Sequence, residues 1–465
     1  MAEISKAEIM RQKDFISRIS DINSQRDNKP LAFVETYGCA QNFNDSEKIC
    51  GMLSDMGFDF CEDKEIADLI IYNTCAVREN AEMRVYGNIG AIKNIKRKRE
   101  GVLLGVCGCM VQQEKIAENV KKRYPYVDMI FGTHALYRFP EILAKAMEKN
   151  RVFDIENSDG AICEDISCKR EAPPLAKIPI MYGCNNFCTY CIVPYVRGRE
   201  RSRSVEAVLE EVRQVALEGY KEVMLLGQNV NSYGNDFKDG TSFAYLLEEV
   251  CKVDGIERVR FMTSHPKDIS DELIEVMARE EKICKQLHLP VQCGSSRILE
   301  KMNRKYTKEQ YLEIVRKVRE KMPEIVLTTD IIVGFPGETN EDFEETIDVL
   351  RKVRYDTIFS FIYSKRGGTP AAVMEDCLTD EEKHKNFDRL LEVQNEISKE
   401  KNEEYLGKTE KVLVEGESKT NPEYLCGRTD GGKIVNFKGD KDMIGKIIDI
   451  KITKTQTWSL GGEVL

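Results

Sequence analysis

Three cysteines lie at a spacing that suits an iron-sulfur cluster with one open iron. Cys184, Cys188 and Cys191 form the pattern Cys-x3-Cys-x2-Cys directly after a short apolar run. Because thiolates are the usual ligands of [4Fe-4S] clusters, three of them can hold three irons and leave the fourth without a protein ligand. A structural zinc site would need a fourth ligand, and Cys168 and Cys251 make no second Cys-x2-Cys pair. The pattern therefore predicts a metal centre with a position kept for chemistry.

A second group of cysteines follows three apolar runs, each of which leads through a turn into a helix-like stretch. The runs lie at 31–34, 69–72 and 102–106. This order is typical of a parallel sheet with crossover helices, in which the carboxyl ends of the strands share one ligand-binding edge. Cys39, Cys75 and Cys109 follow the three runs about 35 residues apart, so their thiolates can meet there. Burial as packing residues stays open for each alone. Cys107 adjoins its run, which favours packing.

Length and composition limit the class of protein. A chain of 465 residues has room for two or three domains, and its net charge of −10 argues against a general polyanion binder. No apolar stretch approaches the length of a membrane span, and the N-terminus has no apolar segment typical of a signal peptide. We therefore expect a cytoplasmic protein, in whose reducing environment the 16 cysteines bind metal or pack rather than form disulfides.

The periodicity predicts an α/β chain of several parts. Between residues 175 and 402, six strand-like runs alternate with helix-periodic stretches, which indicates an open, partial (β/α)6 barrel with function at the carboxyl ends of its strands. Alternation of Ile448, Ile450 and Ile452 with polar residues predicts a small antiparallel β-barrel, for which RNA binding and a plain cap both stay open. The expected parts are a helical extension (1–30), a parallel-sheet domain (31–148), a linker (149–174), the barrel (175–402) and the β module (403–465).

Four arginines after the cysteine motif occur at every second position. Arg197, Arg199, Arg201 and Arg203 would point to one side of an extended segment. Like charges in phase repel unless an anion lies against them, so a phosphate backbone is the predicted partner. A solvated or salt-bridged loop is the alternative.

The cysteine motif resembles the signature of radical S-adenosylmethionine (SAM) enzymes, and its flanks at 185–187 and 192–198 narrow the resemblance to the methylthiotransferases. The phrases at 36–39, 73–79 and 108–110 are similar to the auxiliary-cluster domain of that family, and the C-terminal module is similar to its TRAM domain. Within the family, the resemblance to the MiaB type rests on the phrases at 127–132, 228–234, 263–266 and 456–460. It covers nearly the whole chain from Leu31 onward.

The resemblance implies a tRNA methylthiotransferase that converts N6-isopentenyladenosine, next to the anticodon, to its 2-methylthio derivative. It implies two [4Fe-4S] clusters and SAM as cofactors: one cluster on the first cysteine triad for reductive cleavage of SAM, and an auxiliary cluster on Cys39, Cys75 and Cys109 for sulfur delivery. Adenine C2 carries a strong C–H bond without an acidic proton, so a radical is needed where a base would fail. The implied partners are the tRNA anticodon stem-loop, its target base unstacked, and an electron donor such as flavodoxin or ferredoxin. No membrane is involved, and a monomer is expected.

Further site residues are carried over position by position. Gly227 and Gln228 stand where relatives hold the SAM amino group, and the stretch from Asp330 to Gly337 stands where relatives approach the adenine. Gly334 within it is expected to contact SAM, although a role as a turn glycine stays open for it and for Gly337.

For two histidines and one cysteine near the site, a structural role is expected rather than a catalytic one. His265 and His288 sit at or near strand ends, where ordinary hydrogen-bonded histidines are favoured over catalytic ones. Cys293 stands where most relatives would carry Ser and is expected to fill space.

Two other readings of the chain stay open. The same chemistry could serve N6-threonylcarbamoyladenosine in tRNA or an aspartate of a ribosomal protein, as in other relatives. A noncatalytic iron-sulfur protein that binds RNA or transfers electrons is the alternative of another class, and the open iron argues against it.

Overall fold

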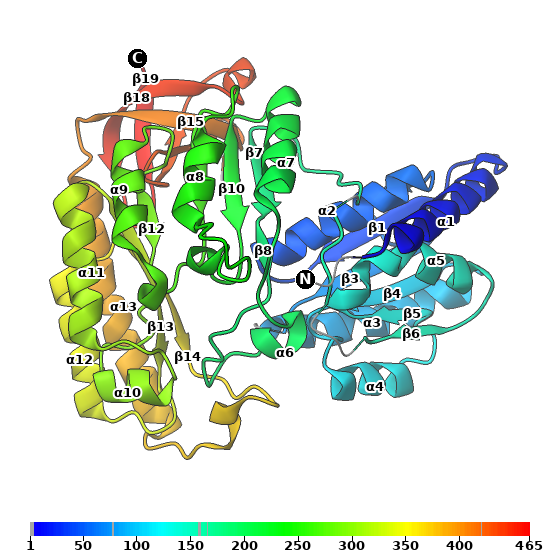
Figure 1. The fold of residues 1–465 in the computed structure, drawn as a ribbon, viewed down its shortest axis with the longest axis horizontal. Helices are drawn as coiled ribbons and strands as arrows, with labels where there is room; N and C mark the ends of the chain where they lie inside the picture. The colour runs from blue at the N-terminus through cyan, green and yellow to red at the C-terminus, as the bar shows by residue number, and fades with distance from the viewer. Residues whose placement is uncertain (1–3, 77–78, 157–159, 165, 420) are drawn as a thin grey trace. The chain divides into compact units, whose positions relative to one another are not determined.

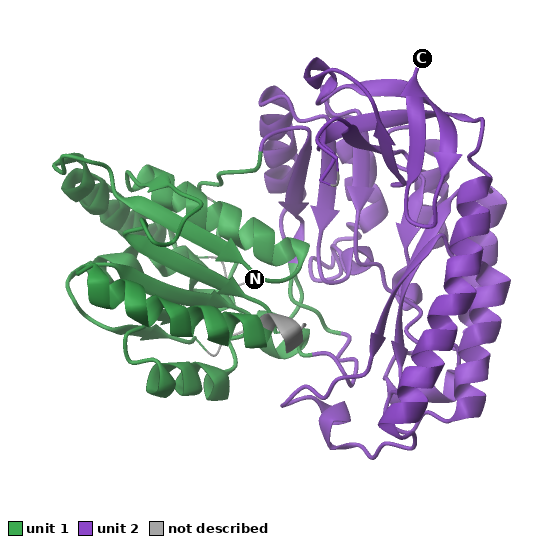
Figure 2. Cartoon of the chain, turned by 180° about the vertical axis from the view of Figure 1, so that it is seen from behind, with its two compact units in different colours: residues 1–171, 182–185, 192–201 green, residues 172–181, 186–191, 202–465 purple. Residues whose placement is uncertain are grey.

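The computed structural model describes residues 4–76, 79–156, 160–164, 166–419 and 421–465. It divides into two compact units (Figures 1 and 2). Unit 1 contains residues 1–171, 182–185 and 192–201, and unit 2 contains residues 172–181, 186–191 and 202–465. The chain passes between the units in the short strands β8 (Met181–Tyr182) and β9 (Arg201–Ser202) and beside the cysteine motif. In the described part of the chain no helix has the length and apolar character to cross a membrane.

Unit 1 is built on a six-stranded sheet whose paired strands all run parallel, in the order β2-β1-β3-β4-β5-β6. Its strands are β1 (Leu31–Thr36), β2 (Asp59–Phe60), β3 (Leu69–Thr74), β4 (Leu103–Gly108), β5 (Met129–Phe131) and β6 (Val152–Asp154). Its helices are α1 (Lys6–Ser24), α2 (Ala40–Asp55), α3 (Glu79–Lys98), α4 (Glu114–Arg123), η1 (Thr133–Arg138), α5 (Phe139–Met147) and α6 (Val193–Arg197). The predicted parallel-sheet domain is confirmed.

Helices cover both faces of this sheet, because its strands are apolar on both sides. Successive residues of a strand point to opposite faces. In β3, Leu69 and Ile71 pack with α1, α2 and α5, whereas Ile70 and Tyr72 pack with α3 and α4. Ile19 of α1 is 1% exposed in the first of these cores, so the N-terminal helix is packed on unit 1.

Unit 2 contains six parallel barrel strands, as the six apolar runs predict, in two three-stranded sheets ordered β11-β10-β7 and β12-β13-β14. The strands are β7 (Leu175–Pro179), β10 (Glu222–Leu226), β11 (Arg258–Phe261), β12 (Gln286–His288), β13 (Val326–Val333) and β14 (Thr357–Ile362). A single bridge, Val259 to Ile283, links the two sheets. With β7 and β14 at the two ends of this order, the barrel is open.

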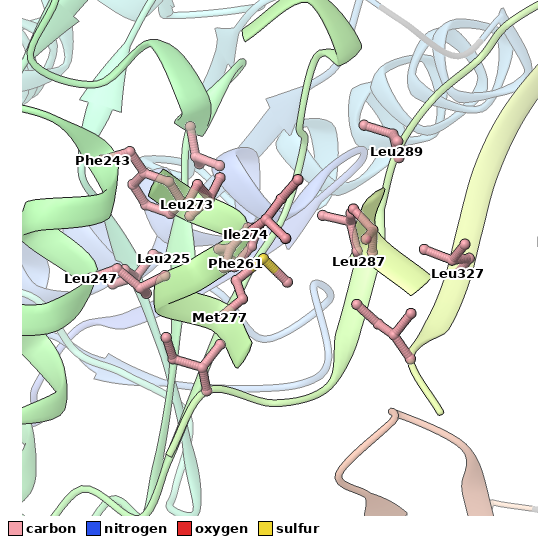
Figure 3. Packing of buried hydrophobic residues seen from close by; sticks show 14 of the residues in the cluster. Leu225, Phe243, Leu247, Phe261, Leu273, Ile274, Met277, Leu287, Leu289 and Leu327 are labelled. Carbon is pink, nitrogen blue, oxygen red and sulfur yellow. The ribbon is translucent and has the colours of Figure 1, made fainter. Parts of the chain in front are cut away.

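The barrel helices alternate with the strands and cover their outer side (Figure 1). They are α7 (Val205–Leu217), α8 (Phe243–Cys251), α9 (Asp271–Arg279), α10 (Ser296–Lys301), α11 (Lys308–Lys321), α12 (Asn340–Val353) and α13 (Asp380–Glu403), with short turns η2 (Val230–Ser232), η3 (Pro266–Asp268) and η4 (Pro370–Val373). Thr307 and Thr339 start α11 and α12 with capping boxes. Leu225, Phe243, Phe261 and Leu273 pack between strands and helices in the core (Figure 3).

The C-terminal module is a closed five-stranded barrel in the order β15-β16-β17-β19-β18. Its elements are β15 (Thr409–Glu417), β16 (Leu425–Thr429), β17 (Ile434–Phe437), η5 (Lys441–Met443), β18 (Ile447–Thr455) and β19 (Leu460–Val464). The expected alternation holds, since Ile450 and Ile452 are buried in its core. The prediction of a purely antiparallel module is wrong in one respect: β17 and β19 pair in parallel, which closes the barrel.

A buried arginine pairs with a carboxylate of the neighbouring barrel strand and also reaches the C-terminal module. Arg260 and Glu222, 4% and 3% exposed, are 2.7 Å apart, and Arg260 also donates to the carbonyl of Thr429 at 2.8 Å. Arg260→Ala leaves a buried carboxylate unpaired, so we expect a loss of about 3–5 kcal/mol in the free energy of unfolding. Urea unfolding of the full chain measures it, with the exposed Arg316→Ala as control. An unchanged midpoint for Arg260→Ala would contradict the assignment.

Candidate active site: two cysteine triads

The three cysteines of unit 1 stand where the parallel sheet predicts. Cys39 precedes the first turn of α2, Cys75 follows β3 and Cys109 follows β4, all past the carboxyl ends of their strands. Strand order reverses between β1 and β3, the place where sheets of this order bind ligands. Two of the three cysteines, Cys39 and Cys75, leave the strands that flank this switch point.

Asn42 lies among these cysteines. Its Oδ1 accepts from the Cys39 thiol at 3.3 Å and lies 3.8 Å from Cys109 Sγ, while its Nδ2 donates to the carbonyl of Thr74 at 2.8 Å. The backbone at Gly38 lies close to the side chain of Cys75. A Cβ at Gly38 would lie 2.6 Å from Cys75 Cβ, so only glycine allows this approach. The structure thus brings Cys39, Cys75 and Cys109 together around one amide.

The three thiols differ in exposure. Cys39 is exposed, whereas Cys75 and Cys109 are 2% and 5% exposed. Burial raises the pKa of Cys109 to about 12 against the opposing effect of Arg197, which favours the protonated thiol. Cys107 points the other way into the apolar core with Leu69 and Met129, as its position beside the run indicates.

The sequence pattern predicts Arg197 as a phosphate contact, but it does not reveal the place of this residue beside the auxiliary cysteines. Its Nε donates to Cys109 Sγ at 3.2 Å, and its Nη2 pairs with Asp45 at 2.6 Å. The side chains of Arg197 and Asp45 are 7% and 8% exposed. Pairing between residues 152 positions apart has no local sequence signal.

The expectation that four arginines point to one side is wrong. The short helix α6 begins at Val193, with Pro194 in its first turn, and ends at Arg197, so Arg197 does not lie in an extended segment. Arg203 is 5% exposed and pairs with Glu211 at 2.5 Å, and Arg201 donates to the carbonyl of Arg199 at 2.6 Å. Only Arg199 of the four is exposed.

The motif cysteines fall on both sides of the division between the units. Cys184 belongs to unit 1, where it is 8% exposed and its N–H donates to the carbonyl of Gly198 at 3.2 Å. Gly183 before it has a φ of +77°, and a Cβ there would lie 2.1 Å from the Arg199 carbonyl oxygen. Only glycine fits this turn, so the chain enters the motif in a fixed direction.

Cys188 and Cys191 belong to unit 2, in a loop tied down by its neighbours. Asn303 Nδ2 donates to the carbonyls of Asn186 and Phe187 at 3.1 and 3.0 Å. Arg304, 4% exposed, directs Nη1 toward Cys188 Sγ at 3.6 Å and donates Nη2 to the carbonyl of Pro290 at 2.7 Å. The loop thus lies against a buried cation, whose guanidinium contacts the Cys188 sulfur.

Five buried polar atoms gather after β10 and β11 without a hydrogen-bond partner among the described residues. They are Gln228 Oε1, Asn229 Oδ1, Asn231 Nδ2, Ser264 Oγ and His265 Nε2. Burial, helped by Arg304, lowers the pKa of His265 to about 2, so its ring is neutral. Its Nδ1 accepts from the N–H of Lys267 at 3.3 Å, which leaves the proton on Nε2. Orphaned buried groups are costly, so this set indicates a polar ligand.

The other positions expected to contact SAM, Gly227, Asp330 and Gly334, have three different environments. Gly227 directly follows β10, where a Cβ would lie 2.6 Å from the Met181 side chain. Asp330 Oδ1 lies 3.5 Å from His288 Nε2 on neighbouring strands. Gly334 has a φ of +73°, and a Cβ there would lie 2.6 Å from the Lys383 side chain, which supports its reading as a turn glycine.

Cys293 fills space in the barrel. It is fully buried between Glu338 and Thr346, with contacts of 3.7 and 3.5 Å to their side-chain oxygens. Burial raises the pKa of Glu338 to about 7. The thiol's own pKa is raised by burial too, so Cys293 is inert at neutral pH.

The donor set fits a cluster better than a single ion. In the described part of the chain, no three His, Cys, Asp or Glu side chains converge as ligands of one metal ion. A [4Fe-4S] cluster needs separate thiolates, each on its own iron, and the thiols of Cys39 and Cys109 at Asn42, with Cys75 beside Gly38, are of the kind that it needs.

Comparison with known proteins gives the family. Three family models match: Radical SAM superfamily at residues 178–350, Uncharacterized protein family UPF0004 at 31–132, and TRAM domain at 403–465. A solved radical S-adenosylmethionine methyltransferase, TsrM from Kitasatospora setae, shares the fold with a TM-score of 0.57 at 16% identity, over 74% of this chain and 75% of that one.

Curated relatives are similar over nearly their full lengths. A tRNA-2-methylthio-N(6)-dimethylallyladenosine synthase from Acetivibrio thermocellus is 54% identical over 99% of this chain and 97% of its own. One from Clostridium tetani is 53% identical over 96% and 98%. The chain belongs to the radical SAM methylthiotransferase family, together with these tRNA-2-methylthio-N(6)-dimethylallyladenosine synthases.

Proposed function

We propose that this chain is a tRNA methylthiotransferase that adds a methylthio group to C2 of N6-dimethylallyladenosine next to the anticodon. The observation that carries the proposal is the identity of 54% to a synthase of that name over 99% of the chain. The expected parts are kept as the proposed domain organisation, and the family models match within three of them. One bound is corrected: β6 (Val152–Asp154) pairs with β5 in the sheet of unit 1, so the parallel-sheet domain extends into the stretch expected to be a linker (149–174).

Each cysteine triad is proposed to hold a [4Fe-4S] cluster, Cys184, Cys188 and Cys191 for SAM and Cys39, Cys75 and Cys109 for sulfur. When bound, the first cluster supplies the electron that cleaves SAM to a radical, and the second supplies the sulfur that is transferred. The chain's own part is to hold the thiolates. Arg304 places a buried positive charge beside Cys188, and Asn42 keeps Cys39 and Cys109 near one another.

SAM is proposed to satisfy the orphaned polar atoms after β10 and β11. His265 Nε2–H is a neutral donor that suits a carboxylate, and Gln228 Oε1 is an acceptor that suits an ammonium. Gly227 lets the backbone pass close to Met181 without a side chain of its own. Asp330 remains the proposed contact toward the adenine, because it faces the same side of β13 as Thr328 and Ile332. A contact of Gly334 with SAM remains part of the proposal, made through its backbone.

The partners proposed are the tRNA anticodon stem-loop and an electron donor such as flavodoxin or ferredoxin, with the chain acting as a monomer. The match to a TRAM domain supports RNA binding by the C-terminal barrel. Arg199 remains a proposed phosphate contact, since it is exposed. Arg197 and Arg203, being buried in ion pairs, are removed from the proposed RNA contacts, and Arg201 bends back to the backbone.

Two aromatic side chains on β14 are proposed to receive the unstacked base. Phe359 and Phe361, 48% and 51% exposed, alternate on the strand opposite Asp330 and Ile332, whereas Ile358 on the other face is buried in the core. Exposed rings beside the proposed SAM site offer stacking for a base or packing for its dimethylallyl group.

Phe361→Ala should therefore lower kcat/KM for a dimethylallylated stem-loop about tenfold or more, because stacking on an aromatic ring contributes about 1–3 kcal/mol per base. Leu217→Ala removes an apolar side chain that is 84% exposed on α7 and serves as the matched control. Steady-state kinetics on the two variants measure kcat/KM for the stem-loop. Equal kcat/KM for Phe361→Ala and the control would show that Phe361 is not part of the site.

The cellular test is nucleoside analysis of tRNA by mass spectrometry. Cells that lack this gene should accumulate N6-dimethylallyladenosine and lose its 2-methylthio derivative, and the wild-type gene should restore it. Intact 2-methylthio-dimethylallyladenosine in the deletion strain would contradict the proposal. Loss of a methylthio group from threonylcarbamoyladenosine instead would favour the alternative substrate.

A further inference from the structure

Arg197 is placed to act on the auxiliary cysteines in a way that a structural ion pair alone does not require. Its guanidinium nitrogen Nη2 donates to Asp45 Oδ2 at 2.6 Å and to Asn42 Oδ1 at 3.4 Å. Its Nε is turned to Cys109 Sγ at 3.2 Å. The planar fork therefore presents donors in two directions, one toward a carboxylate and one toward a sulfur.

The contact with sulfur is held in place by packing. Ile192 and Val196 of the segment around α6 are 5% and 1% exposed and pack against Ala76 and Cys109 in one small apolar cluster. Thr133 Oγ1 donates to the carbonyl of Val196 at 2.6 Å. Because both sides of α6 are fixed on unit 1, the direction of the Arg197 side chain is fixed as well.

Asn42 closes the network around the same sulfurs. Its Oδ1 receives Arg197 Nη2 and lies near Cys39 Sγ and Cys109 Sγ, and its Nδ2 donates to the Thr74 carbonyl and lies 3.2 Å from Asn73 Oδ1. Asn73 in turn donates to the carbonyl of Asn42 at 2.8 Å. A buried network with each member partnered is rigid, so it fixes both the thiols and the cation.

A cation and an N–H donor at a ligand sulfur have a defined effect. Hydrogen bonds to cluster sulfurs and nearby charge set the reduction potential of an iron-sulfur cluster. Reduction adds negative charge to the cluster, so a positive charge and a donor at Cys109 stabilise the reduced state and raise the potential. Outer residues of this kind also orient the ligands that they contact.

We propose that Arg197 is a positioning residue of the auxiliary cluster, which sets the reduction potential of that cluster through its N–H donor to Cys109. The inference rests on the proposed auxiliary site. Arg197 lies six residues after Cys191 in the chain, so the segment that carries the first triad also carries the residue that tunes the second.

The test uses the full chain with Cys184, Cys188 and Cys191 replaced by alanine, so that only the auxiliary cluster gives a signal. In this parent, Arg197→Lys keeps the charge for Asp45 and loses the fork. Arg197→Met with Asp45→Asn removes both charges together, so no buried ion is left unpaired. Arg97→Met is the control, because Arg97 is exposed near the far end of α3, about 30 Å along that helix.

EPR-monitored redox titration with iron and sulfide counts gives the readout. The auxiliary potential should move to more negative values in Arg197→Lys and further in the double variant, and Arg97→Met should match the parent. Loss of auxiliary iron in a variant whose thermal unfolding matches the parent also supports the proposal. Full iron with an unchanged potential in both Arg197 variants overturns it and leaves the auxiliary site standing. A parent that binds no cluster overturns the auxiliary site itself, and the inference with it.

Discussion

Replacement of Cys184, Cys188 and Cys191 together by alanine is expected to abolish reductive cleavage of SAM. It is also expected to leave about half of the iron, because each cluster would have three thiolates of its own. The structure supports independence, since Cys39 and Cys109 have partners within unit 1, namely Asn42 and Arg197. The loop of Cys188 and Cys191 has partners of its own in unit 2, namely Asn303 and Arg304.

The measurement is 5′-deoxyadenosine release by the anaerobic, reduced protein, together with iron and sulfide counts. Cys251→Ala is the matched control, because Cys251 is a buried cysteine of unit 2 outside the motif. Near-total loss of iron in the triple variant would show that the two sites depend on each other. Retained SAM cleavage would show that other ligands hold the first cluster, and failure of the wild-type chain to cleave SAM would revive a noncatalytic role.

Replacement of Cys39, Cys75 and Cys109 by alanine should have the opposite result. SAM cleavage should persist, and methylthio transfer should fall below detection, because the sulfur that is transferred has no site. The separation follows from the same division of contacts: Arg304, which lies beside Cys188, belongs to unit 2, whereas the three replaced cysteines belong to unit 1.

Cys107→Ala distinguishes the ligand from its neighbour. Cys107 and Cys109 are two positions apart, but Cys107 packs with Leu69 and Met129 in the core, whereas Cys109 receives Arg197 Nε. The Cys107 variant should therefore retain product formation with some loss of stability. Loss of methylthio transfer in Cys107→Ala, with transfer retained in Cys109→Ala, would show that the ligand assignment is wrong.

The sequence predicts those parts of the fold in which a local pattern decides the structure. The six strand-like runs predicted between residues 175 and 402 correspond to the six parallel strands of the barrel. Parallel topology follows from the strand-helix alternation, and it predicts where Cys39, Cys75 and Cys109 meet. The parallel pairing of β17 with β19 was missed because barrel closure depends on contacts distant in sequence.

The site is predicted less completely, for the same reason. Alternating arginines suggest an extended strand, but Arg197 ends the helix α6, and it pairs with Asp45, which lies 152 positions away in the chain. Asn231 and Ser264 lie in sequence motifs that resemble those of the family. Only the structure distinguishes them, because each has a buried polar atom without a hydrogen-bond partner among the described residues. Gln228 and Asn229 also have such atoms. Buried polar atoms without a partner are therefore a feature of the site that the structure shows and the sequence does not.

The account is tested most directly by product analysis with purified components. Anaerobically reconstituted protein, SAM and a low-potential reductant are incubated with an anticodon stem-loop that carries N6-dimethylallyladenosine, and the nucleosides are separated by mass spectrometry. The predicted result is 2-methylthio-N6-dimethylallyladenosine, formed by wild type and absent with either cysteine triad replaced. SAM cleavage without this nucleoside, or methylthiolation only of a stem-loop that carries threonylcarbamoyladenosine, would contradict the account.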